Sequence, residues 1–268
     1  MEFKLKTKKP LLMKKFIFAT IATATLCLSF TKEKSFIPPG TVQINDTLFA
    51  DETEISNFSW MEYEYWTKAI YGANSKEHLA TLPDTLIWRE KNSCNEPYVK
   101  YYYRHVGYRD YPVVGISYEQ TLAYCEWRTD RVKAFLTLGK NFKYNNFEYR
   151  LPTKAEWEKL AEFSTHVLNN NGKNDKGKYR INCAHPDTIG TPYPDVTAPV
   201  KSYSKSLYGL YNMLGNVAEM VQEKGICKGG GWRNRLEECR VGKDQEYAKA
   251  NAWLGFRCVC VIKKVSNS

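Results

Sequence analysis

The sequence predicts a single α+β domain with much irregular structure, extending over residues 36–268. Three observations support this fold class. Short alternating apolar runs are typical of strands, three stretches place apolar residues at helical spacing behind capping residues, and the chain beyond residue 190 is rich in Pro, Gly and aromatic residues. The chain has 268 residues, 43% hydrophobic and 14% aromatic, which is sufficient for a packed core.

The first part of this domain is expected to be a hairpin followed by a helix. Apolar residues alternate at 42–44 and 48–50, after a Pro-Pro-Gly turn. Ser56 or Asn57 can then cap a helix, because both side chains can accept a hydrogen bond from a free first-turn amide. Four residues are expected to share one side of that helix: Phe58, Met61, Tyr65 and Trp66.

A buried strand over 113–116 is expected to run directly into the next helix. Ser117 and Gln120 have the spacing of a capping box, in which each side chain pairs with the backbone amide of the other residue. The expected buried face of this helix consists of Leu122, Ala123, Trp127 and Val132.

The same device recurs at RLPTKAEWEKLAEF from residue 150. Thr153 and Glu156 form the second predicted capping box. Trp157, Leu160 and Ala161 then have the spacing of a core-facing side. The polar, Gly- and Asn-rich stretch that follows predicts a surface loop, and no helix longer than about two turns is expected beyond residue 190.

The net charge does not indicate a nucleic-acid partner. The formal charge is +10, of which residues 1–35 supply +6 through eight Lys and two Glu. The remaining chain shows no groove-reading motif and no basic stripe with interleaved aromatic residues. Nucleic-acid binding is therefore not expected.

Residues 1–35 have the pattern of an export signal. Two lysines at 14 and 15 precede the apolar run 16–30, which is too short to span a bilayer and then turns polar. A buried first helix is the alternative. Cys27 lies where a lipoprotein signal places its acylated cysteine, although Leu26 is larger than the residue usual at that cleavage site. We expect an exported protein, periplasmic or outer-membrane-associated, that contacts the membrane only through such a lipid anchor.

Seven cysteines follow Cys27, so at least one thiol has no partner within a monomer. They are Cys94, Cys125, Cys183, Cys227, Cys239, Cys258 and Cys260. The spacing contains no CxxC pair, and none of the four His lie at i,i+4 spacing, so a zinc site is not expected. An oxidising compartment would allow disulfides among these cysteines to persist.

Six blocks of the sequence carry a family resemblance. They are DETEISN at 51, YPVVGISYEQTLAYCEWR at 111, RLPTKAEWEKLAEF at 150, TAPVKSYSKSLYGLYNMLGNVAEM at 197, KGGGWRN at 228 and WLGFRCV at 253. In this order they resemble the formylglycine-generating-enzyme or sulfatase-modifying-factor family, which implies a C-type-lectin-like fold. DETEISN and CEWRTDRV at 125 look like the gliding-motility and type IX secretion lipoproteins within that family, which implies envelope or secretion-system proteins as partners.

The resemblance implies a structural calcium site in NMLGNVAE. The ligands carried over are the Asn212 side chain, the carbonyls of Gly215 and Val217, and the Glu219 carboxylate. Oxygen donors of this kind suit a hard cation in an irregular loop. The alternative is that Asn212 caps a turn and Glu219 is solvated.

The resemblance also shows what catalysis would need. Formylglycine-generating enzymes oxidise a substrate cysteine with oxygen at a copper ion held by two thiolates, ligands that suit a soft cuprous ion. Here the active-site Ser position is Gly231, the first Cys position is Asn234, and only Cys239 is retained. Copper is therefore not expected unless Cys227 or Cys258 supplies the second sulfur, and Cys239 is interpreted as buried or disulfide-bonded rather than catalytic.

Two functions from different classes follow. The first is a non-catalytic binding or structural module of the bacterial cell envelope, linked to gliding motility or type IX secretion. The second is a copper-dependent oxidase that converts a substrate cysteine to formylglycine or oxidises a related thiol. In the first case a polar loop surface is a candidate for ligand contact, or is plainly solvated: Arg233, Asn234, Arg235, Glu237 and Glu238.

Overall fold

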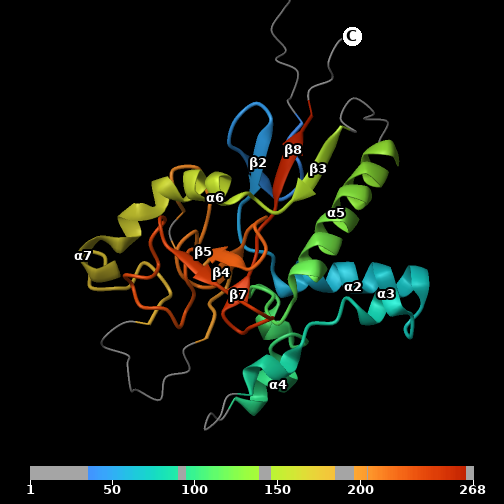
Figure 1. The fold of residues 1–268 in the computed structure, drawn as a ribbon, viewed down its shortest axis with the longest axis horizontal. Coiled ribbons are helices and arrows are strands. Elements are labelled where there is room, and N and C mark those ends of the chain that lie inside the picture. Colours follow the sequence, from blue (N-terminus) through green and yellow to red (C-terminus); the bar gives the residue numbers. More distant parts are fainter. Residues whose placement is uncertain (1–35, 90–94, 139–145, 185–195, 204, 264–268) are drawn as a thin grey trace, which may run out of the picture. The chain divides into compact units, whose positions relative to one another are not determined.

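The strands of this chain form two small sheets, and long irregular segments connect them (Figure 1). The computed structural model describes residues 36–89, 95–138, 146–184, 196–203 and 205–263. All helices and strands in these ranges belong to the unit that begins at Ile37. Because helices and sheets share this unit, the α+β prediction is confirmed.

The first sheet has the strand order β1-β2-β8-β3 and is antiparallel throughout. Its strands are β1 (Thr41–Gln43), β2 (Leu48–Asp51), β3 (Phe147–Arg150) and β8 (Val259–Ile262). The predicted hairpin is confirmed, with Val42 opposite Ala50. The Asn45 side chain closes its turn by accepting from the amides of Thr47 and Leu48, at 3.0 and 2.9 Å.

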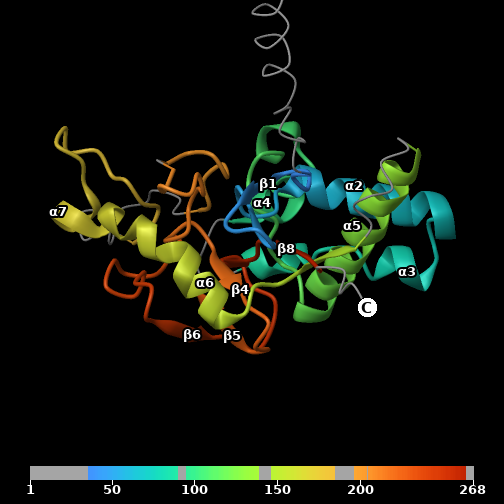
Figure 2. The same cartoon turned by 90° about the horizontal axis from the view of Figure 1, so that it is seen from above.

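The second sheet has the order β6-β5-β4-β7, and its β4–β7 pair is parallel. Its strands are β4 (Ala218–Met220), β5 (Ile226–Lys228), β6 (Asp244–Glu246) and β7 (Leu254–Gly255). Each strand is only two or three residues long, so the sheet depends on the side chains packed around it. Figures 1 and 2 show α6 (Lys154–Ala161) beside this sheet.

Helix α2 (Asn57–Tyr71) begins at the predicted cap, since the Ser56 hydroxyl accepts from the Ser59 amide. It ends at Gly72, whose φ of 95° breaks the helical path. The side that carries Phe58, Met61, Tyr65 and Trp66 is not the one that the helix buries. The helix buries Asn57, Trp60, Tyr63, Glu64 and Thr67, while Phe58 and Tyr65 are 55% and 64% exposed.

Helix α5 (Tyr118–Leu138) begins at the predicted capping box. The Ser117 amide donates to Gln120 Oε1 at 2.7 Å, and the Gln120 amide donates to Ser117 Oγ at 3.2 Å. Its predicted buried face is wrong, because Leu122 and Ala123 are exposed and Trp127 and Val132 are half-buried. The residues that it buries are Thr121, Tyr124, Cys125 and Thr129. Tyr124 lies flat against Trp60 of α2, with ring centroids 5.3 Å apart.

The segment 113–116 before α5 is buried as predicted, but it is not a strand. Its neighbours are irregular segments: the Val113 amide donates to the Ile55 carbonyl, and the Gly115 carbonyl accepts from Asp84. Gly115 has φ 76°, and a Cβ there would lie 2.3 Å from the Asp84 carbonyl oxygen. A ladder cannot form because no extended chain lies beside this segment for more than one residue.

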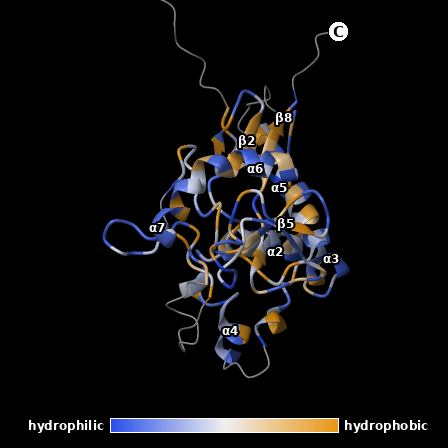
Figure 3. Cartoon of the chain, turned by 60° about the vertical axis from the view of Figure 1, so that its left-hand side comes forward, coloured by the Kyte–Doolittle hydropathy of each residue, from blue (hydrophilic) through white to orange (hydrophobic). Residues whose placement is uncertain are grey.

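Helix α6 confirms the second capping box, with Thr153 and Glu156 pairing reciprocally. Trp157, Leu160 and Ala161 are buried, as predicted. The polar stretch after α6 forms a 3-10 helix (Glu162–Leu168) and the short α7 (Asn169–Gly172), with a hydrophilic loop beyond it (Figure 3).

The remaining helical segments are short. They are α3 (Lys76–Leu79), α4 (Glu96–Tyr101) and the 3-10 helices Thr85–Trp88 and Val106–Tyr108. From residue 196 onward the described chain contains strands and turns but no helix, as predicted. Across the described ranges, no helix has the length and apolar character required to cross a bilayer.

Candidate functional site

The loop that carries Cys239 begins with three glycines after β5, and each of them makes a close approach. Gly229 and Gly230 have φ values of 87° and 68°. A Cβ at Gly230 would lie 2.6 Å from Cys239 Sγ. A Cβ at Gly231 would lie 2.9 Å from the Trp253 carbonyl oxygen. The loop therefore folds tightly against Trp253, just before β7, and against its own cysteine, because these positions have no side chain.

Asn234, at the first family cysteine position, closes a turn instead of facing Cys239. Its Oδ1 accepts from the Gly231 amide at 2.9 Å, and its own amide donates to the Gly231 carbonyl at 2.9 Å. Next to it, Glu238 Oε2 accepts from the Arg235 amide at 2.8 Å. Asn234 acts here as a turn residue, a common role for this side chain.

The rest of the predicted polar loop surface is exposed, Arg233 included. The other exposed residues are Arg235, Glu237 and Glu238. The Arg233 guanidinium lies over the Trp253 ring at 4.3 Å, so its charged group is held against the domain.

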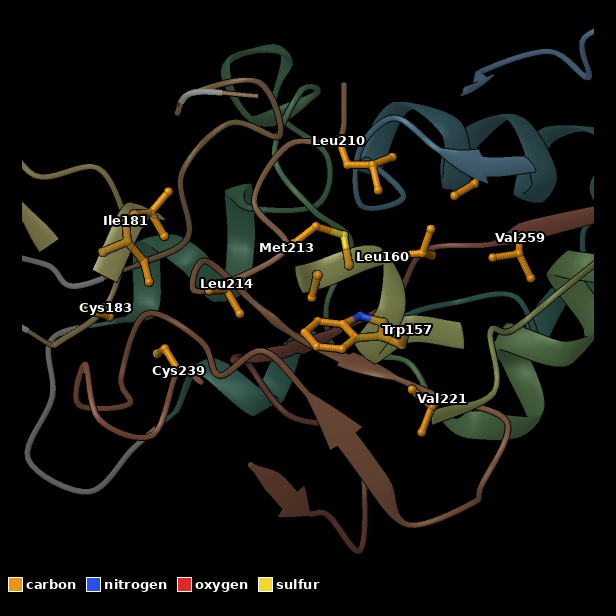
Figure 4. Packing of buried hydrophobic residues seen from close by; sticks show 13 residues of the cluster. Trp157, Leu160, Ile181, Cys183, Leu210, Met213, Leu214, Val221, Cys239 and Val259 are labelled. Carbon is orange, nitrogen blue, oxygen red and sulfur yellow. The ribbon is translucent and has the colours of Figure 1, made fainter. Parts of the chain in front are cut away.

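Cys239 is fully buried, and its neighbour is Cys183 (Figure 4). Hydrogen bonding between these two thiols, together with burial, raises the pKa of Cys239 far above its ordinary value. A thiol in this environment remains protonated and is a poor nucleophile. The expectation that Cys239 is buried is confirmed.

The identity of the neighbouring sulfur corrects the sequence analysis, which named Cys227 or Cys258. Cys227 Sγ points to the Gln245 carbonyl oxygen at 3.4 Å. Cys258 Sγ lies 3.5 Å from the sulfur of Cys125 on α5. Both candidates are therefore engaged elsewhere, and Cys183 comes from a loop that is distant in sequence.

Backbone hydrogen bonds hold Cys183 in place on both sides. The Ala184 amide donates to the Asn234 carbonyl at 2.8 Å, and the Asn216 amide donates to the Asn182 carbonyl at 2.7 Å. Gly215 allows the second contact, because a Cβ there would lie 2.6 Å from the Asn182 carbonyl oxygen. The two thiols meet because the loops that carry them are joined by these main-chain bonds.

Among the predicted calcium ligands, Asn212 retains an open oxygen. Its Nδ2 donates to Glu54 Oε2 at 3.2 Å and to the Val200 carbonyl at 3.1 Å. Its Oδ1 is buried and has no hydrogen-bond partner in the described part of the chain. With φ at 47°, the residue adopts the left-handed conformation that Asn tolerates. An amide oxygen left open in this way fits a cation ligand.

Glu219, the carboxylate of that predicted set, is engaged by protein donors and is not solvated. Arg257 donates to it from Nε at 2.9 and 2.7 Å and from Nη2 at 2.6 Å, and Trp157 Nε1 donates at 2.7 Å. Both Glu219 and Arg257 are buried. Glu219 therefore fits a calcium ligand only if these donors release it.

A second buried carboxylate, Glu54, lies beside this ion pair. It accepts from the Asn216 side chain at 2.8 Å as well as from Asn212. Burial raises the pKa of Glu54 to about 8, against the opposing attraction of Arg257. Glu54 and Arg257 fall in the quoted blocks DETEISN and WLGFRCV, but the sequence analysis gave neither a role. A charged residue inside the apolar stretch WLGFRCV was the signal that could have identified Arg257, whereas Glu54 lies in a polar block that carries no such signal.

A cleft of about 490 Å³ lies between α2 and α5, apart from the cysteine loop. Its base includes the Asp51–Arg128 ion pair, with Oδ2 and Nη1 2.7 Å apart. Its rim includes Phe135 and Leu138, which are 70% and 84% exposed. Arg131 also lines it and stacks on Trp66, 3.6 Å from the ring centroid.

The fold and the loop together define a class of protein: an α+β domain in which irregular segments, pinned by buried polar groups, present a glycine-rich cysteine loop. The chain belongs to the family of the sulfatase-modifying factor enzyme 1-like domain, whose sequence model matches residues 19–262.

Curated relatives match parts of the chain. It is 33% identical over 119 residues to the formylglycine-generating enzyme of Thermomonospora curvata, covering 41% of this chain and 32% of that enzyme. It is 28% identical over 178 residues to the serine/threonine-protein kinase pkn1 of Chlamydia pneumoniae, covering 57% of this chain and 24% of that protein. The chain thus spans about a third or less of the length of these relatives.

Solved structures with similar folds include CarF, with a TM-score of 0.49 and 16% identity over 81% of this chain and 87% of that one. PvdO from Pseudomonas aeruginosa has a TM-score of 0.40 and 21% identity, covering 57% of this chain and 63% of that one.

Proposed function

We propose that this chain is a non-catalytic member of its family that is exported to the bacterial cell envelope and acts there by binding other proteins. Gliding motility or type IX secretion is the proposed setting. The export pattern of residues 1–35 and the blocks DETEISN and CEWRTDRV support this location and setting. The state of the cysteine loop supports the absence of catalysis.

The observation that carries the proposal is the geometry around Cys239. A cuprous site needs two thiolates within bonding distance, and a substrate thiol must reach the metal. Asn234 is used in a turn with Gly231, and Cys239 has no exposed surface. A soft metal would have to be held by two buried thiols, Cys183 and Cys239, whose deprotonation is opposed by burial.

Copper titration tests the proposal that the chain is not catalytic. We expect the purified protein to bind no stoichiometric Cu(I) in competition with a chromogenic chelator, and to consume no oxygen with a cysteine-containing peptide. Asn234→Cys should not restore either property, because residue 234 faces Gly231 rather than Cys239. Stoichiometric Cu(I) binding that is lost in Cys239→Ser would instead establish the alternative, a copper-dependent thiol oxidase.

The cleft between α2 and α5 is the surface proposed for the partner. Phe135 and Leu138 offer exposed apolar area, and Arg131 and Glu62 have no ion-pair partner in the ranges described. These groups suit a protein segment with apolar side chains flanked by charges of both signs. An acidic side chain of the partner would pair with Arg131, and a basic one would pair with Glu62.

Site-specific crosslinking in the native envelope tests the partner. A photoreactive amino acid at Phe135 should capture a defined envelope protein, whereas the same residue at Leu207, which is 86% exposed, should not. Loss of the Phe135 adduct in Arg131→Glu would support the cleft as the surface that binds the partner. Equal capture from both positions, or unchanged secretion and motility after deletion of the gene, would contradict the proposal.

Calcium binding at Asn212, Gly215, Val217 and Glu219 is a further part of the proposal. The open Asn212 Oδ1 supports it, and the Arg257–Glu219 pair opposes it. If calcium binds, a chelator should lower the melting temperature of the wild-type protein, and Asn212→Ala should remove that response. A melting temperature indifferent to chelator and to added calcium would restrict Glu219 to its role as the counter-ion of Arg257.

A further inference from the structure

We infer that Cys183 and Cys239 form a disulfide that fastens the glycine-rich loop after β5 to the loop containing residues 181–184. The retained cysteine of the family's active loop would then be a structural crosslink in this chain. This inference deepens the proposed function and depends on it for one condition, the oxidising compartment in which the bond would form.

The first support for the inference is the position and burial of the two cysteines. The two side chains lie next to each other, and they are 5% and 0% exposed. The interaction with Cys183 and burial both raise the pKa of Cys239. Both cysteines belong to the core cluster that surrounds Trp157 and Leu214 (Figure 4). Neighbouring buried cysteines can be bonded where their Cβ atoms are close and point toward each other, which is the geometry that a disulfide requires.

The surrounding backbone already fixes the two loops side by side. Ala184 and Arg235 form a parallel bridge, and the Ala184 amide donates to the Asn234 carbonyl at 2.8 Å. On the Cys239 side, its own amide donates to the Leu236 carbonyl at 3.2 Å. Gly230 leaves the space that Cys239 Sγ occupies, since a Cβ there would approach it to 2.6 Å.

The crosslink would also explain why the loop retains Cys239 although the residue is not proposed to be catalytic. A reduced, buried pair of thiols contributes little beyond packing, whereas a disulfide between residues 183 and 239 closes a long stretch of chain and restricts the unfolded state. The exposed part of the loop, with Arg235 and Glu238, would then be presented on a covalently anchored turn.

The reaction balances with a disulfide as the oxidant. During folding, before the loops bury the pair, one thiolate attacks a sulfur of the disulfide of an envelope oxidoreductase or of oxidised glutathione. The second cysteine then attacks the protein's sulfur in the mixed disulfide and releases the oxidant as a thiol. The Cys183–Cys239 bond forms with loss of two protons and two electrons. The oxidant's S–S bond breaks to give two thiols.

Peptide mapping tests the bond directly. Protein isolated from an oxidising compartment, or refolded with oxidised glutathione, is unfolded in denaturant, alkylated without reduction and digested with trypsin. The expected product joins peptide 181–201, which contains Cys183, to peptide 236–240, which contains Cys239. Peptide 225–228, which contains Cys227, should be recovered alkylated and serves as the internal control.

Thermal unfolding provides the second measurement. In Cys183→Ser, Cys239→Ser and the double variant the melting temperature should fall by a similar amount, roughly 5–15 °C. A reductant should lower the wild-type melting temperature toward those of the three variants, and it should leave the melting temperatures of the variants unchanged. Cys227→Ser is the control, because it retains the proposed bond and should respond to the reductant as the wild type does.

Separate results overturn the two claims. Recovery of Cys183 and Cys239 alkylated after oxidation, without copper binding, would overturn the crosslink and leave the proposed non-catalytic function intact. A stoichiometric Cu(I) complex of this pair would overturn the proposed function as well. A linked peptide that joins Cys239 to a different cysteine would also refute the pairing.

Discussion

Gly231 shows at the scale of one residue why the loop after β5 differs from a catalytic one. A Cβ there would lie 2.9 Å from the Trp253 carbonyl oxygen and 3.2 Å from the Ala218 amide nitrogen. Both are backbone atoms, so neither can move at low cost. A serine at this position would therefore strain β4 and the residue that precedes β7, as well as the loop itself.

We expect Gly231→Ser to lower the free energy of unfolding by about 1–3 kcal/mol because the added side chain overpacks a closed site. Urea unfolding at neutral pH measures the change. The matched control is Gly242→Ser, since a Cβ at Gly242 meets nothing within 4 Å, and its expected effect is below about 0.5 kcal/mol. Equal losses in the two variants would contradict the steric explanation.

Glu219 and Arg257 form the most deeply buried ion pair described here, with side chains 1% and 0% exposed. Glu219→Gln would leave the guanidinium without its counter-ion, and we expect a loss of about 3–5 kcal/mol in the free energy of unfolding. Urea titration measures it. The double variant Glu219→Gln/Arg257→Met removes the stranded charge and should recover part of the loss. A cost below about 1 kcal/mol for the single variant would show that Glu54 or solvent compensates Arg257.

The roles of single residues were predicted from the sequence only where a local pattern defined them. Gly231, Asn234 and Cys239 could be compared with the family loop by position alone. Cys183 could not, because its proximity to Cys239 depends on main-chain bonds between residues 182–184 and two distant loops. Spacing within one segment carries no information about such a meeting of loops.

At the scale of elements, the N-terminal caps are the features most directly encoded. The Thr153 side chain accepts from the Glu156 amide at 3.2 Å, and the Glu156 side chain accepts from the Thr153 amide at 2.9 Å. Thr153→Ala should lower the free energy of unfolding by about 1 kcal/mol, because the Glu156 amide in the first turn loses the hydroxyl that accepts its hydrogen bond.

The control for that cap is Thr137→Ala near the end of α5, where the exposed hydroxyl donates only to the Lys133 carbonyl. Its expected effect is below about 0.5 kcal/mol. Chemical denaturation of the two variants under identical conditions compares them. A Thr153→Ala loss no larger than the control would show that α6 is held by Trp157 packing alone.

The buried faces of α2 and α5 were harder to predict than their ends. Both helices bury Tyr, Thr and Cys or Trp residues against each other and leave apolar residues such as Phe58 and Leu122 exposed. Aromatic and small polar side chains can occupy either environment, so the apolar periodicity is ambiguous by one position, or about 100° of rotation. In α6 the buried residues are strongly apolar, and the face was predicted correctly.

At the scale of the whole molecule, buried polar groups determine how the irregular segments are arranged. Glu54, Asn212, Asn216, Glu219 and Arg257 join segments that are up to 203 residues apart, and each is buried. The α+β class was predictable because it follows from local patterns. The arrangement of the segments was not, because it depends on which distant carbonyl or carboxylate each buried donor meets.

Glu64 provides a pH-dependent test of the same principle, since it links α2 to α3 and to the chain after α4. It accepts from Tyr103 Oη at 2.6 Å and Arg104 Nη2 at 2.9 Å, and His78 Nε2 lies 3.6 Å away. Burial alone would raise the pKa of Glu64, but the hydrogen bonds from Arg104 and Tyr103 outweigh it and hold the pKa below the ordinary value.

A carboxylate with a lowered pKa in the folded state stabilises the fold above its unfolded pKa, near 4.3, and loses that contribution as the pH falls through the folded value. Glu64→Gln should therefore lower the free energy of unfolding by about 1–3 kcal/mol at pH 7, and the difference from wild type should shrink below pH 4. Urea unfolding from pH 7 to pH 3 measures this. Glu62→Gln, on the same helix and without an ion pair in the ranges described, should show no such dependence. A Glu64→Gln deficit that stays constant down to pH 3 would mean that the variant loses packing or neutral hydrogen bonds rather than the charge that Arg104 and Tyr103 stabilise.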